Sequence, residues 1–347
     1  MKKSLAIILC LAMLLGVLAG CSGGANDKPL VAGYSNFSSK FSPFFSETAY
    51  DQDVWAMTSI SLLDIDRLGA IVEKGKTGET RSYNGHDYTY YGPADLTITP
   101  NADGSVDYDF ELREDIKFSD GKPVTADDVI FSMYVLCDPT YDGNSTLFAQ
   151  PIKGLEDYRS GMSQLMDLLL EAGPDNTDYK YWDEATQKAF WDEVEATGPK
   201  FAQSIVDYCI NNGYNKPEDP IEACAANWGF ELAEDATAAD FWAAILEKYE
   251  NDIPTAVSTE AADVSWDELF PDFGDYTKGI KTGDSAANIA GIEKTGDYSL
   301  RVTLSKVDAT AIYQLGVTIA PLHYYGDASL YDYDKNQFGF PRATSPA

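Results

Sequence analysis

Very few residues in this sequence have the type and spacing that catalysis requires. His86 and His323 are the two histidines of the chain, and neither stands in an H-E-x-x-H motif; there is also no G-x-S-x-G motif. A lone histidine in a Tyr- and Gly-rich stretch, such as His86, is more often a surface residue than a base. Carboxylates are so abundant that pairs of them are expected by chance. The sequence therefore indicates no catalytic residues and predicts that the protein is not an enzyme.

Two stretches imitate binding motifs for phosphate and calcium. Gly75-Lys76-Thr77 looks like the end of a phosphate loop, but Gly69 is misplaced by one residue and no strand precedes it. The stretch 332–336 begins like a calcium-binding loop, yet Gln337 replaces the required glycine and Ala343 stands where the bidentate acid belongs. We therefore expect no cofactor and no metal site.

The chemistry that the N-terminus does predict is lipid attachment. A short positively charged start, Met1-Lys2-Lys3, is followed by an apolar run from Leu5 to Leu18. This run is shorter than the about 20 apolar residues that a membrane-spanning helix needs, but it has the length of a signal peptide. The run ends Leu18-Ala19-Gly20-Cys21, which resembles the bacterial lipobox. We expect residues 1–20 to be removed, Cys21 to carry the lipid anchor, and residues 21–29 to form a flexible tether. A secretory signal with an incidental cysteine is the alternative.

Three other cysteines remain in the expected mature chain, namely Cys137, Cys209 and Cys224. An odd number without a C-x-x-C spacing indicates neither a disulfide framework nor a zinc site. Cys209 and Cys224 could pair outside the cytoplasm, but buried free thiols are an equally good interpretation.

Composition and charge narrow the class of partner. The formal net charge is −31, and removal of the two leader lysines makes it −33. Such acidity argues against nucleic acid or an anionic membrane surface as a partner. The content of 44% hydrophobic and 13% aromatic residues is sufficient for a packed core, and a chain of 347 residues favours two domains.

The clearest element is a strand at 105–113, where apolar and charged residues alternate. Ser119-Asp120-Gly121 predicts a turn, and Thr125 with Asp128 predicts a capping box that starts a helix ending before Pro139. Upstream, the pattern predicts a first strand at 30–34, a helix at about 54–63, and a hairpin or loop at 73–95.

Residues 141–287 predict a helical insertion. Its helical segments are expected at 164–170, 183–195, 201–210 and 238–249, the last one preceded by a second capping box at Thr237 and Asp240. Strands are expected again at 289–293 and 298–304, and a short helix follows from Ala309 to about Leu315.

Residues 110–132, FELREDIKFSDGKPVTADDVIFS, resemble the signature block of the family 5 extracellular solute-binding proteins, which are oligopeptide-, dipeptide- and nickel-binding receptors of ABC importers. Two weaker blocks support the resemblance: Phe41-Ser42-Pro43 with the residues up to 69, and residues 289–304 with Pro321. The helical insertion has no counterpart in this resemblance.

The resemblance implies an α/β fold of the periplasmic-binding-protein-like, class II, three-lobe type. Residues 30–52 would open the first lobe, 53–322 would form the second lobe with the insertion at about 141–287, and 323–347 would begin the return to the first lobe. The family's third lobe lies beyond that return, so we expect an incomplete chain.

The resemblance also implies a function and a site. The protein would capture a peptide or another small solute outside the membrane and deliver it to the permease subunits of an ABC transporter. The segment that pairs with the backbone of the ligand would be Glu47-Thr48-Ala49-Tyr50, although a solvated surface loop is an equal alternative. The alternative function is a surface sensing or interaction lipoprotein that no longer transports.

Overall fold

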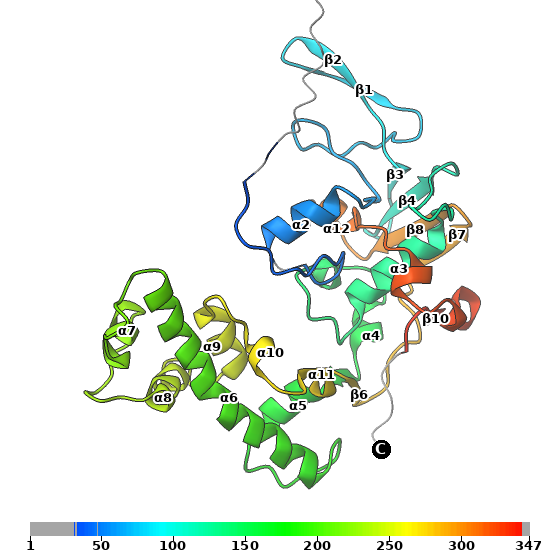
Figure 1. Ribbon diagram of the computed structural model, residues 1–347. Helices are drawn as coiled ribbons and strands as arrows, with labels where there is room; N and C mark the ends of the chain where they lie inside the picture. The colour runs from blue at the N-terminus through cyan, green and yellow to red at the C-terminus, as the bar shows by residue number, and fades with distance from the viewer. Residues whose placement is uncertain (1–30, 32, 47, 342–347) are drawn as a thin grey trace, which may run out of the picture.

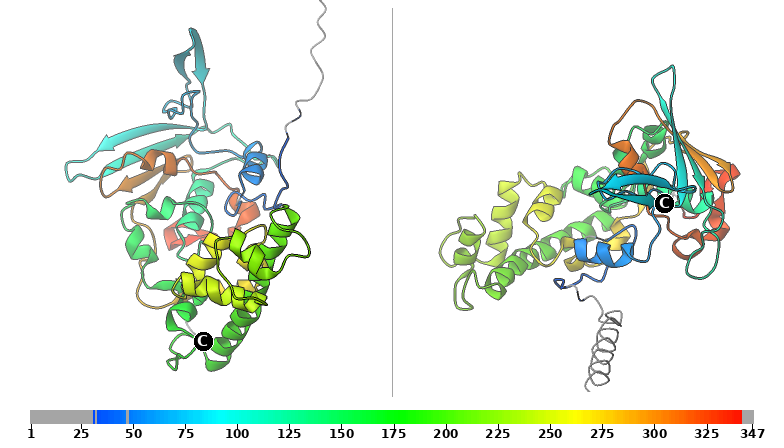
Figure 2. Two further views of the ribbon diagram at one scale, coloured as in Figure 1. Left: turned by 90° about the vertical axis from the view of Figure 1, so that its left-hand side faces the viewer. Right: turned by 90° about the horizontal axis from the view of Figure 1, so that it is seen from above.

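The computed structural model describes residues 31, 33–46 and 48–341. Cys21, the signal peptide expected at residues 1–20 and Glu47 lie outside these residues. Within them, the polypeptide has two hydrophobic cores, one around an antiparallel sheet and one within a group of helices. Figures 1 and 2 show the helical group to one side of the sheet.

The first core is built on a four-stranded antiparallel sheet in the order β3-β4-β8-β7. The alternation expected at 105–113 is confirmed, because Val106, Tyr108, Phe110 and Leu112 of β4 are buried and the intervening residues are more exposed. On the other face, Arg301 of β8 stands directly opposite Asp109 of β4, and their side chains are 2.8 Å apart. The strands are β3 (Ala94–Pro100), β4 (Val106–Leu112), β7 (Ile292–Gly296) and β8 (Ser299–Leu304).

Helix α3 (Ala126–Cys137) packs on the buried face of this sheet. The expected capping box is present: the Asp128 carboxylate accepts hydrogen bonds from the backbone N–H and the hydroxyl of Thr125, both at 2.9 Å. Gly121 adopts φ +88° in the turn before the helix, as a turn glycine can. These local predictions are confirmed.

The N-terminal segment, which we define as residues 33–58, differs from expectation. The described residues Val31, Gly33 and Tyr34 form no strand. The helix of this segment is α2 (Ala49–Ala56), and residues 60–62 run extended beside 317–319, with the Leu62 N–H donating to the Val317 carbonyl at 2.8 Å. The prediction of a helix to residue 63 was wrong, because a distant segment supplies the backbone partners that a helix would otherwise need.

The helical insertion occupies a shorter range than 141–287. It is entered and left through two paired strands, β5 (Met162–Gln164) and β6 (Gly279–Lys281), and all buried residues of the second core lie between positions 165 and 280. Leu147, Ile152, Leu155 and Tyr158 instead belong to the first core. We therefore define the insertion as residues 162–281 and the sheet region as residues 60–161 and 282–340.

The long helix of the insertion corresponds to two expected helices. The segments 183–195 and 201–210 are one helix, α6, which continues through Pro199. Proline removes one backbone hydrogen bond, but packing of the helix against α8 and α10 holds both halves in line. The helices are α5 (Leu165–Ala172), α6 (Glu184–Asn211), α7 (Ile221–Asn227), α8 (Ala238–Lys248), α9 (Ile253–Glu260), α10 (Trp266–Leu269) and α11 (Phe273–Tyr276).

The remaining elements are short. Of the hairpin or loop expected at 73–95, the structure shows a hairpin, a pair of strands that projects from the sheet region in Figure 1. The elements are β1 (Glu79–Tyr83), β2 (His86–Tyr90), η1 (Leu147–Ala149), α4 (Leu155–Arg159), α12 (Ala311–Leu315), α13 (Leu322–Tyr325), η2 (Ala328–Leu330), β9 (Tyr331–Asp332), η3 (Tyr333–Lys335) and β10 (Gln337–Phe338).

Cys137, Cys209 and Cys224 are all free and buried in the structure. Of the two interpretations left open for Cys209 and Cys224, the structure therefore shows buried thiols, both within the second core.

Candidate functional site

The sequence-predicted ligand residues lie at the start of α2. Thr48 is the N-cap residue, and its hydroxyl oxygen accepts a hydrogen bond from the Asp51 N–H at 3.1 Å. Ala49 and Tyr50 form the first turn of the helix and are exposed, so their backbone is helical rather than extended. Glu47 lies outside the described residues. The pairing of a ligand with residues 47–50 stays a prediction.

A buried carboxylate fixes this helix start to the chain before it. Asp51 is fully buried and accepts hydrogen bonds from the Ser38 N–H at 3.1 Å and from the Thr48 hydroxyl at 3.0 Å. Burial by itself raises the pKa of Asp51, but the hydrogen bonds from Ser38 and Thr48 outweigh it and hold the pKa below its usual value. Asp51 therefore stays charged and orders the backbone around Thr48.

Exposed aromatic side chains surround the start of α2. Tyr34 makes an edge contact with Tyr50, with ring centroids 5.6 Å apart, and Phe37 lies 5.8 Å from both Tyr34 and Phe41. All four rings are between 37% and 44% exposed. We call Tyr34, Phe37, Phe41 and Tyr50 the aromatic cluster. Contiguous apolar surface of this kind is typical of interaction sites.

The loop at 141–145 holds the N-terminal segment against the sheet region. The Tyr141 hydroxyl donates to the Phe44 carbonyl at 2.7 Å, and the Asn144 amide donates to the Ser46 carbonyl at 2.9 Å. Gly143 lies so close to this contact that a Cβ there would stand 2.5 Å from the Phe44 oxygen. The loop therefore needs glycine at this position, and its side chains fix the N-terminal segment by binding backbone carbonyls of that segment.

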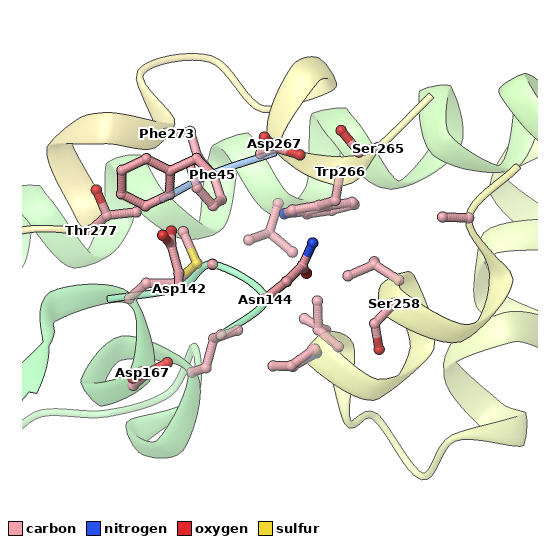
Figure 3. Close-up of a pocket in the computed structure, with 18 of the residues that line it drawn as sticks. Phe45, Asp142, Asn144, Asp167, Ser258, Ser265, Trp266, Asp267, Phe273 and Thr277 are labelled. Atoms are coloured by element: carbon pink, nitrogen blue, oxygen red, sulfur yellow. The ribbon is translucent and has the colours of Figure 1, made fainter. Parts of the chain in front are cut away.

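A cavity of about 690 Å³ lies where the loop, the N-terminal segment and the insertion meet. We call it the insertion cavity; Figure 3 shows it with its side chains. Its walls are mostly apolar and come from five helices of the insertion. Leu170, Phe190, Val194, Val257, Trp266 and Phe273 represent α5, α6, α9, α10 and α11.

The polar groups of the insertion cavity are mainly acidic. Asp142, Asp167 and Asp267 line it, and the basic residue among its lining side chains, Lys40, lies 3.5 Å from Asp267. Partial burial raises the pKa of Asp167. The cavity thus combines an apolar interior with an excess of negative charge.

A second cavity of about 700 Å³ also borders the N-terminal segment. We call it the α2 cavity. Val54 and Trp55 of α2 line it together with Phe41 and the turn at 117–120. His323 Nε2 lies 2.7 Å from an Asp120 carboxylate oxygen at its edge, and no described residue makes a hydrogen bond with the buried indole N–H of Trp55. Neither cavity is lined by Thr48, Ala49 or Tyr50.

The signature residues serve a structural purpose in this arrangement. The Asp128 carboxylate also accepts a hydrogen bond from the Leu322 N–H at 3.0 Å, and the Ser132 hydroxyl accepts one from the Ala320 N–H at 2.9 Å. Both side chains are buried on α3. The block therefore fixes the segment 320–322, which forms part of the wall of the α2 cavity.

In the described part of the chain, the His, Cys, Asp and Glu residues form no group of three that could hold a metal ion. No helix among the described residues has the length and apolar character needed to cross a membrane. His86 is exposed on β2, apart from both cavities.

Comparison with known proteins identifies relatives for the central part of the chain. Residues 95–185 match the family described as bacterial extracellular solute-binding proteins, family 5 Middle. Over 119 residues the chain is 32% identical to the dipeptide-binding protein DppE of Bacillus subtilis (strain 168), which covers 30% of this chain and 21% of that protein. The structure of Burkholderia pseudomallei OppA matches 35% of this chain and 20% of its own, with 24% identity and a TM-score of 0.25.

The family match and the identity to DppE support the relation to family 5 that residues 110–132 indicated. The fold class is α/β and periplasmic-binding-protein-like, as expected. The match to DppE spans about a fifth of that protein's length.

Proposed function

We propose that this protein is the substrate-binding component of an ABC transporter, which captures peptides outside the cytoplasmic membrane and delivers them to a permease. The family match over residues 95–185 and the identity to a dipeptide-binding protein support this function. The family's description as extracellular agrees with the predicted export signal.

The observation that carries the proposal is the aromatic cluster beside residues 48–50. Its four exposed rings flank the ordered start of α2, and Tyr50 belongs to both. A peptide that bound along residues 47–50 would cover these rings and remove their apolar surface from water. Contacts through its main chain would accept many side chains, as a peptide receptor requires.

Calorimetry with defined dipeptides tests this proposal. We expect heat of binding for the unmodified protein and a loss of about tenfold in affinity for Tyr50→Ala, which removes one ring of the cluster. Tyr91→Ala is the matched control, because Tyr91 is exposed but stands outside the cluster. Absence of binding by the unmodified protein to dipeptides and longer peptides would contradict the proposal.

The predicted lipid anchor at Cys21 belongs to the same function. An anchor would hold the receptor in the membrane that contains its permease and would raise the effective concentration of each for the other. An inhibitor of lipoprotein signal peptidase should leave a larger precursor in cells, and Cys21→Ser should release the protein from the membrane fraction. Unchanged mobility and unchanged membrane association would contradict the anchor.

A further inference from the structure

The insertion cavity has features that the proposed peptide site does not explain. Thr48, Ala49 and Tyr50 do not line it, although Lys40 and Phe45 of the N-terminal segment do, and most of its wall is formed by the insertion. Its volume of about 690 Å³ lies in the range of roughly 300–1,000 Å³ typical of pockets for small ligands.

The interior of this cavity suits a ring or a branched apolar group. Phe190 and Val194 of α6 are buried and form part of its floor, and Trp266 of α10 is 9% exposed. Figure 3 shows Trp266 and Phe273 on the insertion side, across from Asp142 and Asn144 of the loop. Aromatic walls of this kind bind rings by stacking and edge contacts, and they also attract cations.

The charged groups of the cavity favour a ligand of one sign of charge. Three aspartates and one lysine line the cavity, which leaves an excess of two negative charges. Lys40 lies 3.5 Å from Asp267, whereas Asp167, which is exposed, makes no ion pair with a lysine or arginine among the described residues. An anionic ligand would meet repulsion here, whereas a ligand with an ammonium group would gain an ion pair.

One further polar group in the cavity lacks a partner. Ser265 lines the cavity, and its hydroxyl oxygen is shielded from solvent and makes no hydrogen bond with any described residue. Buried hydroxyl groups are nearly always hydrogen-bonded, so an unpaired one beside a cavity indicates a missing partner. Either a water molecule or the polar group of a ligand could supply that partner.

We propose that the insertion cavity is a binding site for an organic cation that carries one ammonium group on an aromatic or branched apolar body. The apolar body contacts Trp266 and the α6 side chains, and the ammonium group pairs with Asp167. This site is independent of the proposed peptide site, and the insertion supplies most of it.

Titration calorimetry of the full chain with phenethylamine tests the proposal. Phenylacetamide, which keeps the ring and loses the charge, and ethylamine, which keeps the charge and loses the ring, are the matched probes. We expect saturable binding of phenethylamine and at least about tenfold weaker binding of each control. Equal binding of all three probes, or no heat with phenethylamine, would overturn the proposal.

Two variants locate the site. Asp167→Asn keeps the shape of the side chain and should weaken phenethylamine binding by about tenfold, and Val257→Trp should abolish it by filling the cavity. Asp175→Asn is the control, because Asp175 is an exposed acid in the insertion that does not line the cavity. Circular dichroism checks that each variant is folded. If the Val257→Trp variant is unfolded, the affinity of the Asp167→Asn variant for phenethylamine decides the test. Unchanged affinity in Asp167→Asn would overturn the proposed pairing.

Peptide binding is measured on the same variants. We expect Asp167→Asn to bind dipeptides like the unmodified protein and Tyr50→Ala to bind phenethylamine like the unmodified protein. The two proposals can therefore fail separately.

Discussion

In the sheet region, side-chain hydrogen bonds join residues that are far apart in sequence. In the insertion, the hydrogen bonds to the buried Glu260 join residues that are closer in sequence. Arg301 pairs with Asp109 across 192 positions, and the Ser132 hydroxyl accepts from Ala320 across 188. In the insertion, the buried Glu260 accepts hydrogen bonds from Lys248 at 2.7 Å and Trp228 at 2.9 Å, 12 and 32 positions away. Short separations cost less entropy to close.

This difference indicates which of the two regions can unfold without the other. The insertion is joined to the sheet region at the ends of the β5–β6 pair, by a hydrogen bond from the Gln164 amide to the Thr140 carbonyl at 2.7 Å, and around the insertion cavity. Its own core is separate. We therefore expect the insertion to unfold locally at lower denaturant concentration than the sheet region, as units with few contacts to the rest of a protein do.

The largest expected effect is that of Gly291→Ala in the sheet region. A Cβ at Gly291 would stand 2.6 Å from the Thr303 carbonyl oxygen and 2.8 Å from the Lys153 nitrogen, both in the backbone. Three segments are joined at this point, so none can shift alone. We expect a loss of about 3 kcal/mol in the free energy of unfolding, measured by urea denaturation. Gly316→Ala, whose nearest neighbour would be 3.5 Å away, is the control.

Gly198→Ala should give the next largest effect, but in the insertion alone. A Cβ at Gly198 would overlap the indole of Trp242, which is buried against α6. The added helix propensity of alanine is about 1 kcal/mol, and the clash should exceed it by about 1–2 kcal/mol. Hydrogen exchange should show lost protection in 165–280 and unchanged protection in β4 and β8.

Gly274→Ala provides the comparison for that result. No atom lies within 4 Å of a Cβ at Gly274, and its backbone requires no glycine. Equal loss of protection in both regions for Gly198→Ala would show that the two cores unfold as one unit. It would contradict the expectation that the insertion unfolds separately from the sheet region.

A smaller, pH-dependent effect is expected at Asp128 of the sheet region. Burial raises its pKa above the ordinary value of 3.8, although hydrogen bonds from Leu322 and Thr125 oppose the shift. The folded state therefore retains the proton to higher pH than the unfolded state does. The contribution of this group to stability is greatest at low pH and is lost as pH rises from about 3.8 through the folded pKa.

Comparison with the Asp128→Asn variant isolates the contribution of the Asp128 carboxyl group to stability. The stability of the unmodified protein relative to the variant should fall with rising pH by about 1.4 kcal/mol for each unit by which the pKa is raised. Urea denaturation between about pH 4 and 7 measures it. A difference that stays constant with pH, or that grows with rising pH, would contradict the burial argument.

The smallest effect concerns the thiols under native conditions, where we expect almost no reaction. Burial raises the pKa of Cys137 to about 12 and also raises the pKa values of Cys209 and Cys224, so the reactive thiolate is scarce. With increasing urea, iodoacetamide should label Cys209 and Cys224 before Cys137. Peptide mapping by mass spectrometry reads each site, and labelling of Cys137 first would reverse the proposed order of opening.

The sequence determined the elements whose causes are local. The alternation at 106–112, the turn at Gly121 and the capping boxes at Thr125 and Thr237 each depend on neighbours a few positions away, and all appear in the structure. The α/β class and the relation to family 5 depended on one such block. The ligand residues predicted at 47–50 rested on resemblance alone and stay a prediction.

Tertiary contacts decided the features that local patterns could not. Residues 60–62 run beside 317–319 because a distant backbone is available there, and residues 147–158 join the sheet core although their pattern resembles that of the insertion. The insertion cavity arises where residues 40–45, 142–144 and five helices meet. Each contributes ordinary apolar or acidic side chains that carry no motif. Their chemistry becomes visible only when folding places them around one space, since spacing in the sequence does not record such a meeting.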